Sequence, residues 1–351
     1  MENNIASEDL HNTVLYFRDS RVHSWRWQPI LEKWGHLKVL IDPEYLKTAT
    51  FLIENGEPIS TVFFVRVPLS TPSVPIGYDY YAVTTLHSIK DREVAIRFNL
   101  KQGGFQDKRI NPNDWIPNPV QDIAILQVRF PFDEYDVKFI DTYEISKDKD
   151  YLISIEPPRH KTGAEADKTV LMRRYGVGDE VFSIGLFLSH YGEAIAQPAA
   201  RFGHIALKPA AGEKILAEME PNKWAPIDAF VVEITALPGQ SGSPVFIRPQ
   251  VRKEGDKPRT LWEYNFLIGM IQGFFPEEHQ ARLQVRNLKV TFNTGLGIVI
   301  PSQHIVEMLM EKSLVKKREE RLRKIREEQA NSRRKARMAS ISGSNKQGNI
   351  T

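Results

Sequence analysis

Ser241 lies in a hexapeptide, residues 239–244, that reads Gly-Gln-Ser-Gly-Ser-Pro. A serine flanked by glycines is typical of a tight loop that exposes its hydroxyl for nucleophilic attack. In such a loop the amides of Gly239 and Ser241 can point toward one position, where they would stabilise a developing oxyanion. The alternative is an ordinary Gly/Ser/Pro turn, and the hexapeptide taken alone favours that alternative.

Two upstream residues could supply proton transfer to such a nucleophile. His87 ends an apolar, β-rich run that starts at residue 82, where a strand could hold the imidazole at the edge of a cleft. Asp122 directly precedes the apolar run 123–126, and a carboxylate beside a buried strand needs a partner. The Nδ1–H of a neutral histidine is such a partner. The alternatives are an ordinary core or surface histidine and an aspartate that merely ends a strand.

Short runs of β-branched and aromatic residues surround these positions. Clusters of Pro, Gly, Asn and Asp separate the runs, and few segments have a helical period, which predicts an all-β barrel or sandwich. The predicted strands are residues 61–67, 80–85, 93–98, 123–130, 180–185, 200–207, 230–235, 244–247, 266–273 and 297–300. A helical pattern follows from residue 301. Residues 146–176 and 248–259 are charged or Pro-rich and are predicted to be surface insertions.

Composition limits the class of protein. The chain has 351 residues, of which 41% are hydrophobic and 26% charged, as expected for a soluble globular protein of one large or two ordinary domains. It contains no Cys, which excludes disulfides, thiolate metal sites and a cysteine nucleophile. The longest apolar stretch, residues 181–188, is too short to span a bilayer. The first twenty residues lack an uninterrupted apolar core, so we predict no Sec-type export and a cytoplasmic location.

Positive charge is concentrated at the C-terminus. Residues 311–351 contain 13 Lys and Arg against 5 Asp and Glu, whereas the rest of the chain is mildly acidic. Residues 316–337 are predicted to form a helix, and the residues after 338 to be disordered. A solvated helix with pairs such as Glu320–Lys324 is the favoured interpretation. The alternative is a docking element for a polyanion or a regulatory partner.

The order His87, Asp122, Ser241 resembles that of the trypsin/chymotrypsin superfamily of serine proteases. Residues 83–87 (Val-Thr-Thr-Leu-His) are similar to the family's Val-Thr-Ala-Ala-His, and residues 122–126 to its Asp-Ile-Ala-Leu-Leu. Further segments resemble the Deg-type bacterial branch, namely residues 177–181, 184–185, 203–205, 267–271 and 295–301. The resemblance covers about residues 40 to 312, and we expect no PDZ domain after residue 301, since about 50 residues remain.

The resemblance implies a fold and a reaction. It implies two six-stranded antiparallel Greek-key β-barrels over residues 37–312, with an N-terminal extension (1–36) and a basic tail (313–351). Ser241 would attack the peptide carbonyl of a protein or peptide substrate, His87 would act as general base, and Asp122 would orient the imidazole. The oxyanion hole would be formed by Gly239 and Ser241, and neither a cofactor nor a metal is needed. The competing hypothesis is a catalytically silent or partner-activated scaffold of the same fold.

The resemblance also predicts a specificity pocket. Its floor would lie near Thr235, which is uncharged and therefore favours an uncharged P1 residue. Its walls would come from Gln272, Gly273, Phe274, Thr294, Gly295 and Gly297. Gln240 stands where the family often has an Asp that pairs with a newly cut N-terminus, so activation through that ion pair is not expected. Gating would fall to the N-terminal extension or to residues 146–176.

Overall fold

The computed structural model describes residues 41–70, 76–148, 151–155, 170–220, 223–235, 237–247, 251–254, 257–260, 265–283 and 286–347. The chain divides into two compact units, Met1–Asp42 and Pro43–Thr351. Every helix and strand named below lies in the second unit. The predicted N-terminal extension, residues 1–36, lies outside the described residues, as does the middle of the predicted insertion 146–176.

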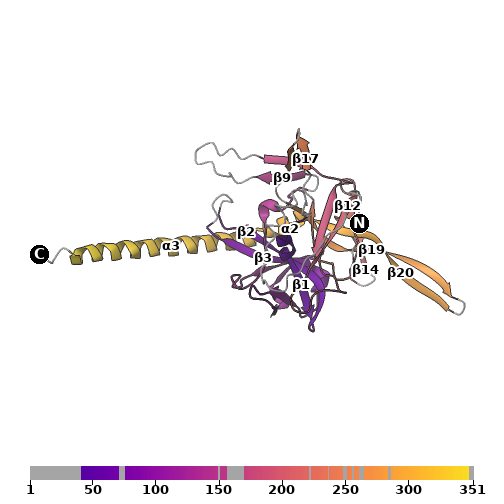
Figure 1. The fold of residues 1–351 in the computed structure, drawn as a ribbon, viewed down its shortest axis with the longest axis horizontal. Helices are drawn as coiled ribbons and strands as arrows, with labels where there is room; N and C mark the ends of the chain where they lie inside the picture. Colours follow the sequence, from indigo (N-terminus) through magenta and orange to yellow (C-terminus); the bar gives the residue numbers. More distant parts are fainter. Residues whose placement is uncertain are drawn as a thin grey trace, which may run out of the picture. The chain divides into compact units, whose positions relative to one another are not determined.

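The C-terminal half of the second unit is a closed six-stranded barrel (Figure 1). Its order is β11-β12-β15-β20-β19-β16, and β16 returns after β15 to pair with β11, which is a Greek key. The core consists of alternating apolar residues such as Val181, Val232, Val245 and Val299, all nearly fully buried. The strands are β11 (Glu180–Gly185), β12 (Ala199–Leu207), β15 (Phe230–Glu233), β16 (Pro244–Ile247), β19 (Phe266–Leu283) and β20 (Arg286–Pro301).

The N-terminal half is an eight-stranded sheet. Strands follow the order β5-β4-β1-β2-β3-β7-β6, with β8 pairing parallel to β2. Because β4 returns to pair with β1, this sheet also contains a Greek key. The strands are β1 (Ala49–Glu54), β2 (Glu57–Pro68), β3 (Tyr78–Thr85), β4 (Ala95–Asn99), β5 (Phe105–Arg109), β6 (Trp115–Asn118), β7 (Ile123–Val128) and β8 (Ile140–Asp141).

Smaller elements precede, separate and follow these strands. Three two-stranded hairpins are β9 (Tyr151–Ile155) with β10 (Val170–Arg174), β13 (Ile215–Glu220) with β14 (Lys223–Ile227), and β17 (Val251–Glu254) with β18 (Lys257–Thr260). The short 3-10 helices are η2 (Pro43–Thr48), η3 (Leu86–Ser88), η4 (Pro112–Asp114) and η5 (Thr142–Glu144). Two α-helices, α2 (Ser302–Leu309) and α3 (Lys312–Gln347), end the chain.

The predicted all-β fold class is confirmed, and each of the predicted strands coincides with an observed one. The second barrel has the six strands expected. The first sheet has eight strands. Its end strands, β5 and β6, are not paired with each other among the strands that the structure describes. The predicted insertion 248–259 contains most of the β17–β18 hairpin, and the helix predicted at 316–337 lies within the longer α3.

A small apolar cluster joins the sheet to the barrel. Phe51 and Ile53 of β1 pack with Ala95 of β4 and with Leu186 and Ala196, which flank the connection from β11 to β12. All five are nearly fully buried. Because Leu186 directly follows β11, this cluster fixes the end of the barrel strand against the first sheet.

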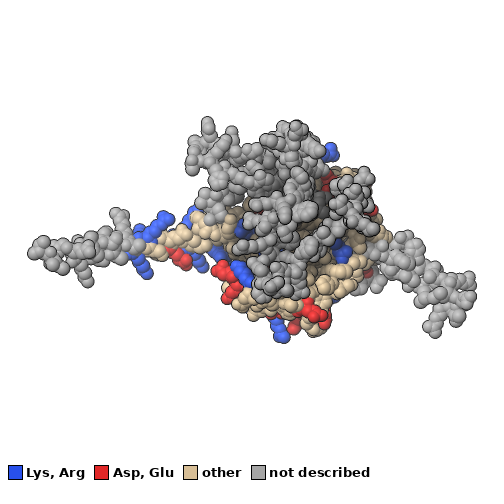
Figure 2. Space-filling view, viewed as in Figure 1, with Lys and Arg blue, Asp and Glu red and all other residues tan. Residues whose placement is uncertain are grey.

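Two arginines attach α3 to the first sheet. Arg318, which is 6% exposed, donates to the Tyr81 hydroxyl (2.9 Å) and to the carbonyl of Leu309 (2.6 Å). Arg321 forms an ion pair with Asp79, a buried residue of β3. Further along, Lys and Arg side chains project from the exposed part of α3 together with Glu side chains (Figure 2). In the part of the chain that the structure describes, every helix is too short or too polar to serve as a membrane span.

We predict that Arg318→Ala lowers the free energy of unfolding by about 1.5–3 kcal/mol, because a charged donor is lost and two buried acceptors are left unpaired. Urea-induced unfolding measures the change. Arg326→Ala is the matched control, since Arg326 is exposed on the same helix, and its effect should stay within about 0.5 kcal/mol. Equal effects of the two substitutions would contradict this role of Arg318.

Candidate active site

Two paired strands bring His87 and Asp122 together. β3 and β7 are antiparallel, and Thr85 lies opposite Ile123 at the ends of both strands. His87 follows β3 in η3, and Asp122 immediately precedes β7. The Leu86 amide donates to the Asp122 carbonyl (3.0 Å), which joins the end of β3 to the start of β7. Asp122 has φ +55°, a left-handed conformation that aspartate tolerates better than most residues.

Both carboxylate oxygens of Asp122 bind His87. The His87 amide donates to Oδ1 (2.9 Å), and Nδ1 lies 2.6 Å from Oδ2. Asp122 is 1% exposed, so its charge has almost no water to stabilise it and depends on these partners. With its proton on Nδ1, the imidazole donates to the carboxylate and leaves Nε2 free to accept a proton.

Gln272 of β19 is a third partner of Asp122. Its Nε2 donates to Asp122 Oδ2 (3.0 Å) and to the carbonyl of Glu218 in β13 (2.8 Å). The side chain is buried, so both amide hydrogens have partners where water is excluded. Through this amide the carboxylate of the first sheet is hydrogen-bonded to a strand of the barrel.

Ser241 lies in the loop between β15 and β16, close to the same residues. Its Oγ donates to the backbone carbonyl of Gln272 (3.0 Å), the residue whose side-chain amide binds Asp122. No hydrogen bond joins Ser241 to His87 among the residues described. Asp122 and Ser241 thus both bind Gln272, and His87 binds Asp122, with the serine hydroxyl held by a carbonyl rather than by the imidazole.

A buried polar pair on β2 holds the loop that carries Ser241, the candidate nucleophile. The Thr61 amide and the Ser60 hydroxyl both donate to the Ser241 carbonyl, at 3.0 and 2.6 Å. Thr61 Oγ1 donates to the Gly239 carbonyl (3.0 Å). Ser60 Oγ also lies 2.8 Å from the Ser88 hydroxyl, next to His87. Ser60 therefore binds both the loop and the residue that follows His87.

Two amides of this loop have no acceptor among the residues that the structure describes. Gly239 has φ +89°, a left-handed conformation that glycine tolerates and other residues rarely adopt. Across the described part of the chain, neither the Gly239 nor the Ser241 amide donates a hydrogen bond. Unpaired amides beside a serine hydroxyl are the donors that an oxyanion requires.

The residues predicted to line a specificity pocket lie on neighbouring segments. Thr235 is exposed after β15. On β19 the Gln272 side chain binds Asp122, and Phe274 packs against the barrel core beside Gly273. On β20, Gly297 lies opposite Phe274, and Thr294 donates to the Phe275 carbonyl (2.8 Å) next to Gly295. Their role in a pocket stays a prediction.

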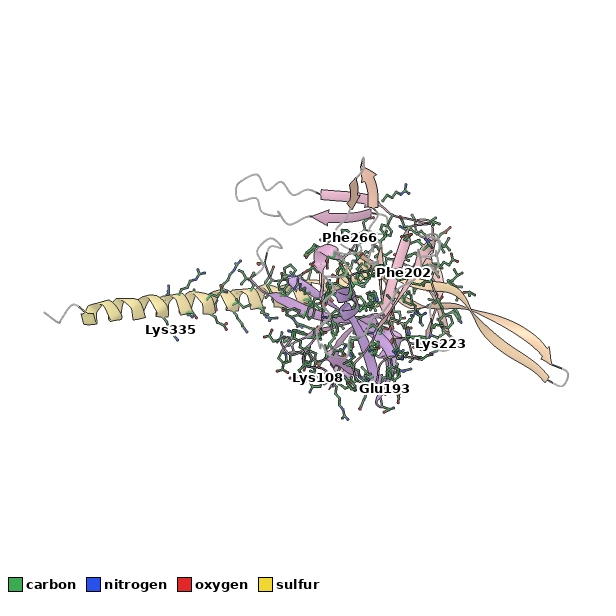
Figure 3. All side chains as sticks on the ribbon, in the orientation of Figure 1. Lys108, Glu193, Phe202, Lys223, Phe266 and Lys335 are labelled. Atoms are coloured by element: carbon green, nitrogen blue, oxygen red, sulfur yellow. The ribbon has the colours of Figure 1, made fainter. Side chains whose placement is uncertain are left out.

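Charged groups flank the histidine on the outside. Lys90, just after η3, pairs with Glu220 at the end of β13, and Lys223 of β14 pairs with the same carboxylate. The hydrogen bonds from Lys223 and Lys90 lower the pKa of Glu220 to about 2, and the bond from Glu220 raises that of Lys90. Figure 3 labels Lys223 on this hairpin. The β13–β14 hairpin is thereby tied to the loop that carries His87.

Several residues of the site were not predicted. Ser60 and Thr61 form the only polar pair in the apolar run of β2, which is a weak signal of a buried hydrogen-bonding role. Glu218 contributes only its backbone, which no side-chain pattern can reveal. Among the described residues, no group of three or more His, Cys, Asp or Glu side chains is placed to hold a metal ion.

Comparisons with known proteins add a remote likeness. No family model matches the chain, and no curated protein matches it. It is similar to the crystal structure of Rv3671c from M. tuberculosis H37Rv, a serine-to-alanine mutant in its inactive form, with 13% identity over 78% of this chain and 92% of that one (TM-score 0.35). It is also similar to human heparin binding protein, with 8% identity over 77% and 92% of the two chains (TM-score 0.40).

We predict that Gly242→Ala disrupts the nucleophile loop. Gly242 has φ +86°, and a Cβ there would lie 2.0 Å from the carbonyl oxygen of Thr61. Crowding and left-handed strain together should lower the free energy of unfolding by about 2–5 kcal/mol. Gly104→Ala is the matched control, because Gly104 also has positive φ (+79°) but has nothing within 4 Å of the added Cβ. Thermal unfolding measures both, and similar losses in the two variants would show that the contact with Thr61 is unimportant.

Proposed function

We propose that the protein is a serine endopeptidase of the trypsin/chymotrypsin type. The observation that carries the proposal is the buried carboxylate of Asp122, 2.6 Å from His87 Nδ1, with Ser241 on the adjacent loop. A histidine oriented by a buried carboxylate beside a serine with two unpaired amides is suited to acyl transfer and to little else. Protein or peptide chains with an uncharged P1 residue are the proposed substrates.

The mechanism begins with a rotation of Ser241. Its Oγ leaves the Gln272 carbonyl and donates to His87 Nε2, which then takes the proton as Oγ attacks the scissile carbonyl. The Gly239 and Ser241 amides stabilise the oxyanion of the tetrahedral intermediate, and Asp122 stabilises the imidazolium. As the intermediate collapses, the C–N bond breaks and His87 protonates the leaving amine, which leaves the acyl group on Ser241 Oγ. His87 then takes a proton from water as the water oxygen attacks the acyl carbon, and gives that proton to Ser241 Oγ as the ester C–O bond breaks.

The competing proposal is a scaffold that is silent or needs a partner to become active. The bond from Ser241 to Gln272, in place of one to His87, is the observation in its favour. Against it stand the three side chains themselves, since a scaffold with no reaction to perform has no need for a buried carboxylate that binds an imidazole.

We predict that a fluorophosphonate probe adds once to the wild-type protein, as read by intact mass. Ser241→Ala should abolish the adduct, and His87→Ala should slow labelling by about 10³-fold or more, because the serine loses its base. Ser243→Ala is the matched control: Ser243 lies two residues away in the same loop but is buried, and its hydroxyl donates to Thr61. It should label like the wild type.

Absence of labelling in every variant, while all remain folded by circular dichroism, would contradict an intrinsically active enzyme and favour the scaffold. Labelling that persists in Ser241→Ala would assign the nucleophile to another residue.

We also propose that α3 contacts a polyanion. Every residue from Arg326 to Lys335 is exposed, and Arg333, Arg334 and Lys335 are adjacent (Figure 3 labels Lys335). This part of the helix has no apolar face with which to enter a membrane or pack on another protein, so its charge is what a partner would contact.

We predict that replacing Arg333, Arg334 and Lys335 together by Gln lowers the salt concentration that elutes the protein from phosphocellulose, because fewer counterions are exchanged. A triple Gln variant at the exposed residues Lys101, Arg109 and Lys214 removes the same formal charge elsewhere and should lower it less. Equal shifts would indicate that only net charge matters, which would overturn a role for α3.

A further inference from the structure

Three buried donors without partners lie near the nucleophile loop. In the described part of the chain, the buried side-chain atoms that lack a hydrogen-bond partner are Trp115 Nε1, Ser183 Oγ, Arg201 Nε and Gln240 Nε2. The last three belong to the barrel or to the loop before β16. Each can donate a hydrogen bond, and none has an acceptor. Leaving such a group unpaired in a protein interior costs about 1–3 kcal/mol, so their accumulation in one region calls for a physical reason.

Ser183 and Arg201 share one face of the barrel wall. They lie directly opposite each other in the antiparallel β11–β12 pair, so their side chains point to the same side. Val181, two residues before Ser183, and Val245, opposite Ser183 on β16, both belong to the barrel core. The side chains of Ser183 and Arg201 are therefore directed to the barrel interior.

The next cross-strand pair along that face contacts the loop that carries Ser241. Gly185 and Ala199 lie opposite each other, two residues beyond Ser183 and Arg201 and on the same side of the strands. A Cβ on Gly185 would lie 1.9 Å from Ser243 Oγ, so the loop fills the space that Gly185 leaves. Ser183 and Arg201 are thus one row of side chains, about 7 Å along the strands, from the loop that carries Ser241.

Gln240 supplies the third donor from the loop itself. It directly precedes Ser241 and is 1% exposed. Its Oε1 accepts a hydrogen bond from the Leu237 amide (3.3 Å), which leaves the Nε2 group as the part without a partner. The Ser243 amide donates to the Gln240 carbonyl (2.9 Å), so the residue lies in the turn that faces Gly185.

Arg201 carries the charge of this region without a counterion. No ion pair involves it among the residues described, and its guanidinium lies 5.3 Å from the ring centre of Phe187, just after β11. Burial lowers its pKa, as expected for a cation that has lost water and gained no carboxylate. Its neighbour Phe202, on the opposite side of β12, is labelled in Figure 3. A half-buried guanidinium with further donors near it is an environment that favours an anion.

We propose that Arg201, Ser183 and Gln240 form a receptor for a single carboxylate behind the nucleophile loop. A planar carboxylate fits the fork of a guanidinium and offers enough lone pairs for a hydroxyl and an amide as well. The carboxylate comes either from a small free acid or from an acidic side chain of the peptide substrate. Only the second source rests on the proposed endopeptidase function.

The binding arm uses acetate as the probe and thermal unfolding of the full chain as the readout, against chloride at equal ionic strength. A ligand that binds only the folded state raises the melting temperature. Acetate should raise that of the wild type in a saturable way, and Arg201→Gln should weaken the apparent affinity about tenfold to a hundredfold, since a charge-assisted pair is lost. Arg92→Gln, at an exposed arginine paired with Glu54, is the control and should behave like the wild type.

The substrate arm compares peptides that carry Glu or Gln at each position around the cleaved bond. A kcat/KM preference for Glu at one position, lost in Arg201→Gln but kept in Arg92→Gln, assigns the carboxylate to the substrate. Acetate binding without such a preference assigns it to a free acid. If acetate acts equally on wild type and Arg201→Gln and no Glu preference depends on Arg201, the receptor does not exist. The binding arm gives its answer even if no activity is found, so the two proposals fail separately.

Discussion

The buried carboxylate of Asp122 is the constraint around which the rest of the site is arranged. A carboxylate with 1% exposure is tolerated only with strong donors, and three reach it: the His87 amide, the His87 ring and the Gln272 amide. Removing one partner of a buried charge typically costs about 3–5 kcal/mol. The end of β3, the start of β7 and the barrel strand β19 are therefore held in one geometry, because any relative displacement would leave a charge unpaired.

A second polar contact, centred on Thr61, extends that geometry to the nucleophile loop. Thr61 binds the loop at Gly239 and Ser241, and its own carbonyl accepts from Thr84 on the neighbouring strand. Gly242 is required because its missing side chain lets that carbonyl approach. The polar contacts fix the orientation of the loop relative to the first sheet, whereas the apolar cluster between β1 and the residues after β11 only holds the sheet and the barrel close together. Together they specify where the hydroxyl of Ser241 lies relative to the imidazole.

Much of this was predictable from local sequence and some was not. The bounds of β11 and β16 were predicted to the residue, since each is a short run rich in β-branched and aromatic residues next to turn residues. The proximity of His87 and Asp122 was predicted from their positions at the ends of apolar runs. The role of Gln272 was missed: it was assigned to a pocket wall, but its amide reaches Asp122 from another sheet. The β13–β14 hairpin was also missed, because its residues alternate between apolar and charged over only a few positions.

The bond between Ser241 and Gln272 is compatible with the proposed catalysis on energetic grounds. A neutral hydrogen bond contributes about 0.5–1.5 kcal/mol net, and rotating the hydroxyl toward His87 exchanges this bond for another of the same kind. The free-energy difference between the two arrangements therefore corresponds to about a tenfold change in population at most. A base and an oxyanion hole contribute several orders of magnitude in rate. The resting position of one hydroxyl thus weighs little against the arrangement of His87, Asp122 and the two free amides, which cannot be altered without breaking buried hydrogen bonds.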